Sequence, residues 1–114
     1  MIAQPIRLRS DYCGLSMKNA VFEYLRTIPA GKVVTYSQVA AAVGHPGACR
    51  AVGNILHTNP DPDTYPCFRV VNAKGMTAEH FGFGGREEQV RRLRADGIEV
   101  TGGRVDLNKY QWNP

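Results

Sequence analysis

The residue whose side chain is best suited to covalent chemistry is Cys67, which lies in the run Pro66-Cys67-Phe68-Arg69-Val70. A cysteine attacks a carbon electrophile as the thiolate, so it needs a neighbouring base or cation to lower its pKa. Phe68 cannot accept a proton, and burial beside its ring raises the pKa of a thiol. The run therefore predicts either a weakly activated thiol or a small, buried and unreactive cysteine.

The other cysteines and the histidines show no spacing typical of a metal site. The chain has three Cys and three His, and no Cys-x-x-Cys pattern occurs, so we expect no metal and no cofactor. Widely spaced, odd-numbered cysteines and an N-terminus without a signal-peptide pattern predict an intracellular protein with reduced thiols. No apolar run approaches the ~20 residues of a membrane span, so no membrane association is expected.

A second candidate is Arg50, the only charged residue of segment 47–57. The net charge is +4 and the isoelectric point about 9.2, and no Asp or Glu occurs from Tyr24 to Pro60. An acid-free stretch suits a surface that faces phosphates, although a small buried helix pair would also contain few charges. Ala51 and Gly53 are small, which fits a helix lying close to DNA with one projecting arginine or, equally well, tight packing between helices.

Local signals predict the elements that position these residues. Apolar spacing indicates a helix over 16–27, with Ser16 as its N-cap. A β-branched strand over 33–35 leads into a capping box formed by Thr35 and Gln38. The helix after it should end at Gly44, and a tight turn at 45–47 should lead to a helix over 47–57. Two short helices joined by such a turn are a helix-turn-helix candidate.

The second half of the chain is predicted to form short strands, turns and one helix, separated by loops. We expect the following segments: a loop at 59–63, a strand over 65–71, a turn at 72–75, an aromatic-glycine loop at 81–85, a helix over 86–95 stopped by Gly97, and a hairpin over 98–107 turning at 102–103. The fold class is therefore mainly α with short β elements, in a single domain.

These motifs, in this order, resemble the C-terminal domain of O6-alkylguanine-DNA alkyltransferases and the related alkyltransferase-like proteins. The resemblance runs from about residue 16 to the C-terminus and rests on these segments: Ile28-Pro29-Ala30-Gly31-Lys32, Thr35-Tyr36, Arg50-Ala51-Val52-Gly53, Asn59-Pro60 and Pro66 to Val71. It implies a winged-helix-like helix-turn-helix domain over 16–114, preceded by an N-terminal extension over 1–15.

The resemblance also implies roles for individual residues. Tyr36, Arg50, Ala51 and Gly53 would contact DNA, with Arg50 filling the gap left by an extruded base and Tyr36 contacting the phosphate of the flipped nucleotide. Cys67 would occupy the position of the alkyl acceptor, and Asn59 would tie the helix pair to the pocket. The lesion pocket would comprise Asn59, Pro66, Cys67, Phe68, Arg69, Val70, His80, Phe83, Gly84 and Gly85.

The sequence departs from the family at the residues that activate the thiol. The alkyltransferase motif reads Pro-Cys-His-Arg-Val, with a glutamate that orients the histidine; Phe68 and Asp96 stand at these positions. Alkyltransferase-like proteins usually carry tryptophan where this chain has Cys67, although its loop at 75–85 and its tail at 105–114 resemble theirs.

The resemblance therefore implies a monomeric DNA-repair protein that flips O6-alkylguanine out of double-stranded DNA, binds it as a lesion sensor and hands it to other repair proteins. The first alternative is a single-turnover methyltransferase with Cys67 as acceptor. The second is a winged-helix DNA-binding module without lesion preference.

Overall fold

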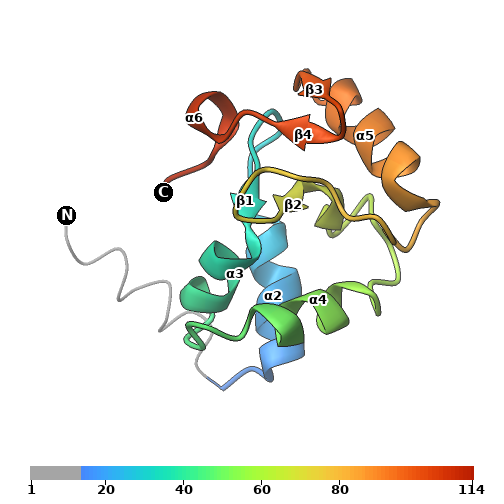
Figure 1. Cartoon of the computed structure of the whole chain (residues 1–114). Helices are drawn as coiled ribbons and strands as arrows, with labels where there is room; N and C mark the ends of the chain where they lie inside the picture. The colour runs from blue at the N-terminus through green and yellow to red at the C-terminus, as the bar shows by residue number, and fades with distance from the viewer. Residues whose placement is uncertain (1–13) are drawn as a thin grey trace.

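The computed structural model describes residues 14–114. Its first half is a bundle of three helices that pack on one another, in the lower part of Figure 1: α2 (Met17–Leu25), α3 (Tyr36–Ala42) and α4 (Cys49–Leu56). Between the helices and the rest of the chain lies a short parallel pair, β1 (Val34–Thr35) and β2 (Val70–Val71), with Val34 opposite Val70. This pair ties the bundle to the segment that carries Cys67.

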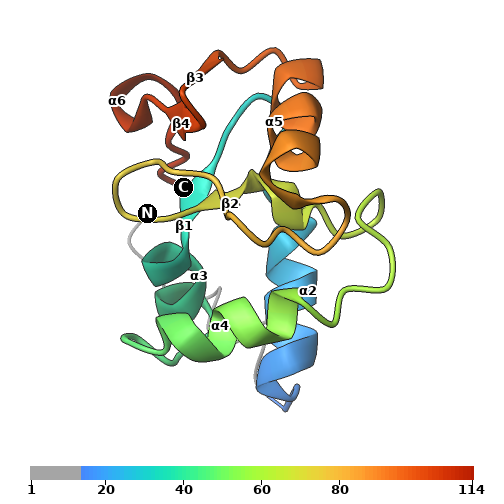
Figure 2. The same cartoon turned by 45° about the vertical axis from the view of Figure 1, so that its right-hand side comes forward.

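The second half covers the upper part of the same view (Figure 1). Its elements are the 3₁₀ turn η1 (Cys67–Arg69), α5 (Gly85–Ala95), the antiparallel strands β3 (Val100–Thr101) and β4 (Arg104–Val105), and α6 (Leu107–Tyr110). The C-terminal tail then returns to the bundle, where the Trp112 amide donates to the Val33 carbonyl at 2.8 Å and the Gln38 side chain donates to the Trp112 carbonyl at 2.7 Å. Figure 2 shows β1 running between the two halves.

The predicted helix ends are confirmed where local chemistry specified them. Ser16 caps α2 by accepting from the Asn19 amide at 3.1 Å. Thr35 and Gln38 form both hydrogen bonds of the capping box at the start of α3. Gly44 and Gly97, with φ of 86° and 88°, follow α3 and α5, in the left-handed conformation that glycine adopts most readily after a helix.

The predicted strand over 65–71 is wrong for most of its length, because only Val70 and Val71 pair with a neighbouring strand. Pro66 has no amide hydrogen to donate to a ladder. The chain instead makes local turns, in which the Cys67 amide donates to the Tyr65 carbonyl at 2.7 Å and the Arg69 amide to the Pro66 carbonyl at 3.0 Å. The predicted hairpin over 98–107 is confirmed as β3–β4, but α6 was not predicted.

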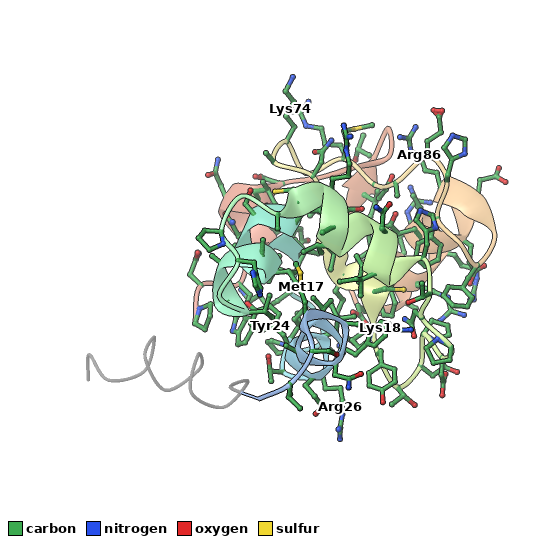
Figure 3. All side chains as sticks on the ribbon, turned by 90° about the horizontal axis from the view of Figure 1, so that it is seen from below. Met17, Lys18, Tyr24, Arg26, Lys74 and Arg86 are labelled. Carbon is green, nitrogen blue, oxygen red and sulfur yellow. The ribbon has the colours of Figure 1, made fainter. Side chains whose placement is uncertain are left out.

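The core lies where the three-helix bundle meets β1, β2 and α5, and its largest fully buried apolar side chains include Tyr24, Leu25 and Leu93. Figure 3 looks along α2, with α4 lying across it. In the part of the chain that the structure describes, no helix has the length and apolar character needed to cross a membrane. Within the same residues no group of His, Cys, Asp or Glu is placed to hold a metal ion.

Candidate nucleic-acid interface

The helix pair predicted to bind DNA is present, with α3 and α4 joined by a short connection. Cys49, the first residue of α4, lies beside α3, with its Sγ 3.3 Å from the Ser37 Oγ. Arg50 follows in the first turn of α4 and is exposed. Within residues 14–114 no carboxylate lies within ion-pairing distance of Arg50. Its guanidinium is therefore available to an outside partner.

Gly53 in the middle of α4 is not required by packing within the chain. A Cβ built on it would meet no described atom within 4 Å, so tight helix packing does not explain this glycine. Glycine in a helix interior costs about 1 kcal/mol relative to alanine. Arg50, Gly53 and His57 are spaced three and then four residues apart, which places them along one face of α4. The small residue thus leaves open space on the same face as Arg50.

Replacing Gly53 by alanine should change stability and binding in opposite directions. The added methyl favours the helix, so the free energy of unfolding should rise by about 1 kcal/mol. If DNA approaches this face closely, the same methyl should weaken DNA binding by about 1–3 kcal/mol, the usual cost of overpacking a close contact. Urea denaturation and a DNA-binding titration on the same variant measure both quantities. Unchanged or tighter binding by the more stable variant would show that nothing approaches α4 at Gly53.

Beside this face of α4 is a small pocket of about 60 Å³. It is enclosed by α3, α4, η1, the loop before α5 and α5 itself. The lining residues are Tyr36, Gly53, Leu56, His57, Cys67, Ala78, His80, Phe81, Gly82, Phe83 and Gln89. The loop wall is aromatic, with the rings of Phe81 and Phe83 packed 5.8 Å apart between their centroids.

The Cys67 thiol forms part of the pocket wall, and its residue is only 5% exposed. Burial raises the pKa of this thiol above its usual value, and three weaker effects oppose that rise only in part: a hydrogen bond from the Asn59 side chain, a backbone hydrogen bond at Cys67 and the positive charge of Arg92. Burial also raises the pKa of the half-buried Tyr36 hydroxyl, and the neighbouring Cys67 adds to the effect. At neutral pH both groups are therefore protonated, and the thiol is held in its less nucleophilic form.

Asn59 connects the end of the helix pair to the segment that carries Cys67. Its side-chain amide donates to the Tyr65 carbonyl at 2.7 Å, and its side-chain oxygen accepts from the Asp61 amide at 3.0 Å. Buried Asn59 therefore fixes the chain on both sides of its loop.

Phe68 and Arg69, the two residues after Cys67, do not line the pocket and belong to a separate structural cluster. The Arg69 guanidinium donates to both carboxylate oxygens of Asp96, at 2.7 and 3.2 Å, and to the Ile28 carbonyl at 3.0 Å. The Phe68 ring is flanked by the Arg69 and Arg92 guanidinium groups, 5.1 and 5.9 Å from its centroid. Asp96 is thus engaged by Arg69 and orients no group beside the thiol.

Five of the residues predicted from the sequence line this pocket: Tyr36, Gly53, Cys67, His80 and Phe83. The other predicted residues do not line it. Arg50 and Ala51 lie on α4, Asn59 in the loop after α4, Phe68 and Arg69 within η1, Pro66 and Val70 on either side of η1, and Gly84 and Gly85 at the start of α5. Phe81 and Gly82 also line it and belong to the aromatic-glycine loop at 81–85, whereas four lining residues were not predicted from the sequence: Leu56, His57, Ala78 and Gln89. Helical spacing from Arg50 and Gly53 could have identified His57, whereas no local pattern indicates Gln89.

A larger and more open groove, of about 490 Å³, lies between the turn at 73–74, the β3–β4 hairpin and α6. It contains none of the residues singled out from the sequence. Its lining carries charges of both signs, including Lys74, Arg104, Glu99 and Asp106. The pocket beside α4 is therefore the candidate site, despite its smaller size.

The helix pair α3–α4 is typical of a DNA-binding domain, and its exposed Arg50, which has no ion pair among residues 14–114, lies on the helix that adjoins the pocket containing Cys67. Residues 16–98 match the family described as 6-O-methylguanine DNA methyltransferase, DNA binding domain. The chain belongs to this family.

Its similarity extends to proteins with different names. It is 39% identical over 97 residues to a DNA base-flipping protein of Vibrio parahaemolyticus, covering 82% of this chain and 93% of that protein. It is 38% identical over 100 residues to a bifunctional methyltransferase/endonuclease of Picrophilus torridus, covering 87% of this chain. The chain spans 33% of the length of that relative.

The fold is also similar to a structure solved with DNA. S. pombe Atl1, in complex with damaged DNA containing O6-carboxymethylguanine, superposes with a TM-score of 0.76 and 31% sequence identity. The similarity covers 86% of this chain and 95% of that one. The relatives therefore include both methyltransferases and proteins named for base flipping or crystallised on a lesion.

Proposed function

We propose that this protein is a sensor of O6-alkylguanine in double-stranded DNA. In this proposal α4 enters the minor groove, Arg50 occupies the space vacated in the base stack, and the alkylated base rotates into the pocket beside Cys67. The protein binds the lesion without removing the alkyl group. It acts inside the cell, where the DNA is. The similarity to Atl1, crystallised on DNA containing O6-carboxymethylguanine, supports this choice of lesion.

The observation that best supports the proposal is that the Cys67 thiol is buried and protonated and has no activating base among the described residues. The thiol is buried, its pKa is raised, and within residues 14–114 no imidazole or carboxylate is hydrogen-bonded to it. Nucleophilic transfer needs a base or cation that stabilises the thiolate. The residue after the thiol is Phe68, and the carboxylate of Asp96 is already paired with Arg69. The pocket therefore supplies shape and apolar contact for a base but little activation.

The pocket must widen before a base can enter. A volume of about 60 Å³ corresponds to roughly two water molecules at liquid density, which is too small for a purine double ring. The wall formed by 81–85 is the part best suited to move, because its glycines give the backbone conformational freedom, and Gly84 and Gly85 have φ of 127° and 78°. We propose that this loop shifts outward as the flipped base arrives.

The experiment compares two duplexes that differ only at one base, O6-methylguanine or guanine. We expect binding to the damaged duplex to be tighter by about tenfold or more, within the 1–3 kcal/mol that one base contact commonly contributes. Fluorescence anisotropy at fixed salt measures both affinities, and the salt must be fixed because phosphate contacts depend on it. Equal affinities would instead indicate a winged-helix module without lesion preference.

A second candidate function is single-turnover methyl transfer, which is favoured by one observation: the Cys67 thiol lines the pocket. In that reaction the Cys67 sulfur loses its proton and forms a bond to the methyl carbon, the bond from that carbon to O6 breaks, and the released purine takes up a proton to become guanine. The name of the Picrophilus relative includes a methyltransferase activity.

Phe68→His tests whether the missing histidine alone prevents transfer. We expect the variant to fall far short of the roughly 10²- to 10⁴-fold gain in transfer rate that a positioned general base contributes, because Asp96 is held by Arg69 and two guanidinium groups flank position 68. Cation proximity also disfavours the imidazolium that a general base would form. Mass spectrometry of the protein after incubation with the damaged duplex measures transfer. A variant that becomes fully methylated within minutes would show that position 68 alone blocks the reaction.

A lesion sensor that leaves the alkyl group in place needs other repair proteins to act on the marked site. We propose that this protein acts as a monomer on DNA and presents the flipped lesion to such partners.

A further inference from the structure

The rim of the pocket carries two imidazoles from opposite walls. His57 follows the last residue of α4, and His80 precedes the aromatic loop at 81–83; both are exposed and both line the pocket. In the described part of the chain neither imidazole has a hydrogen bond or ion pair. The resemblance to the alkyltransferase-like proteins assigned His80 to the lesion pocket, whereas it assigned no role to His57.

The position of His57 follows from the geometry of α4. It lies seven residues after Arg50 on the same helix face, which is about 10 Å along the axis at 1.5 Å per residue. Gly53 lies between them and leaves the intervening surface open. The His57 Nδ1 also lies 3.7 Å from the position that a Cβ on Gly82 would occupy. His57 therefore lies between α4 and the loop that forms the other wall.

The pocket offers few free polar groups besides these imidazoles. The Gln89 side chain donates to the carbonyls of Phe68 and Val70 at 3.1 and 3.0 Å and accepts from the Ala78 amide at 2.7 Å, so its hydrogen-bonding groups are occupied. The remaining wall is apolar or aromatic, apart from Tyr36 and the weakly polar thiol. A purine presents acceptor atoms along its edges, including N7, and each neutral imidazole has one N–H to donate.

We infer that His57 is a binding residue for the extruded nucleotide and donates a hydrogen bond to the flipped purine at the rim of the pocket. The contact forms only after the base leaves the stack, so His57 contributes to the preference for damaged DNA and little to binding of an intact duplex. This inference rests on the proposed function, because it requires a base to enter the pocket.

The test uses His57→Ala and three duplexes, which carry O6-methylguanine, guanine or an abasic site at one position. His45→Ala is the matched control, because His45 is an exposed histidine between α3 and α4 and lies outside the pocket. We expect His57→Ala to weaken binding to the O6-methylguanine duplex by about tenfold, the upper range for one neutral hydrogen bond. Binding to the guanine and abasic duplexes should change by less than about twofold, as should binding of His45→Ala to all three.

Two results would overturn the inference. Unchanged affinity of His57→Ala for the O6-methylguanine duplex would show that the imidazole makes no contact with the base. An equal loss on all three duplexes would show that His57 contacts the sugar-phosphate backbone instead. If the unmodified protein showed no preference for O6-methylguanine, the proposed function itself would fail, and this outcome is distinguished because it does not depend on the variant.

Discussion

Replacement of Arg50 by alanine should weaken binding to a duplex containing O6-methylguanine by about 1–3 kcal/mol, or roughly 5- to 150-fold. Extrusion of a base costs a few kcal/mol of lost stacking and pairing. A guanidinium can offset part of this cost, because it is planar, stacks on neighbouring bases and donates hydrogen bonds to the base left without a partner. Arg50 is exposed on α4 and, among the described residues, has no ion pair to break on insertion.

Arg91→Ala is the matched control for the loss of one positive charge. Arg91 is exposed on α5, outside the helix pair, and pairs with Glu88. Both variants have the same net charge, so a purely electrostatic attraction to DNA would weaken both to a similar degree. We expect the large loss only for Arg50→Ala, and it should be greater on damaged than on undamaged DNA. Equal, small losses for the two variants would remove the assignment of Arg50 to the vacated base position.

Asp96→Ala should have the largest effect on stability, lowering the free energy of unfolding by about 3–5 kcal/mol. The Asp96 and Arg69 side chains are 13% and 15% exposed, so removal of the carboxylate leaves a largely buried guanidinium without its partner. The pair also connects three separate segments, because Arg69 lies in η1 and donates to the Ile28 carbonyl after α2, and Asp96 directly follows the last residue of α5. Urea denaturation monitored by circular dichroism measures the change.

Two further variants show whether the loss of stability comes from a buried unpaired charge or from the loss of an ion pair as such. Asp63 also pairs with an arginine, Arg92, but its side chain is 86% exposed, so Asp63→Ala should cost no more than about 1 kcal/mol. The double variant Arg69→Met with Asp96→Leu should recover much of the lost stability, because it removes both buried charges together. If Asp96→Ala were as stable as the unmodified protein but lost a methyl-transfer activity, Asp96 would have the role of the family glutamate instead.

Local chemistry made the first half of the fold predictable. Ser16, the capping box at Thr35 and Gln38, and the glycine at 44 each satisfy or terminate backbone hydrogen bonds within a few residues, so their effects are visible in the sequence. The helix pair and its lone arginine followed from these signals.

The segment around Cys67 was predicted poorly because distant contacts decide its conformation. Its β-branched and aromatic residues favour a strand, but the carbonyls of Phe68 and Val70 are satisfied by the buried Gln89 of α5. That partner lies 21 residues from Phe68 and 19 from Val70, and no local pattern indicates the pairing. The ion pair between Arg69 and Asp96 was not predicted for the same reason, since its partners lie 27 residues apart in the sequence.

We propose that the protein binds O6-alkylguanine and leaves the alkyl group on the DNA. The most direct test incubates the protein with a duplex carrying O6-methylguanine, follows binding, and then measures the intact mass of the protein from the same sample. The account predicts preferential binding to the damaged duplex and a protein of unchanged mass. Addition of one methyl group, abolished in Cys67→Ala, would contradict it and would show that the buried thiol of Cys67 is activated without the family histidine.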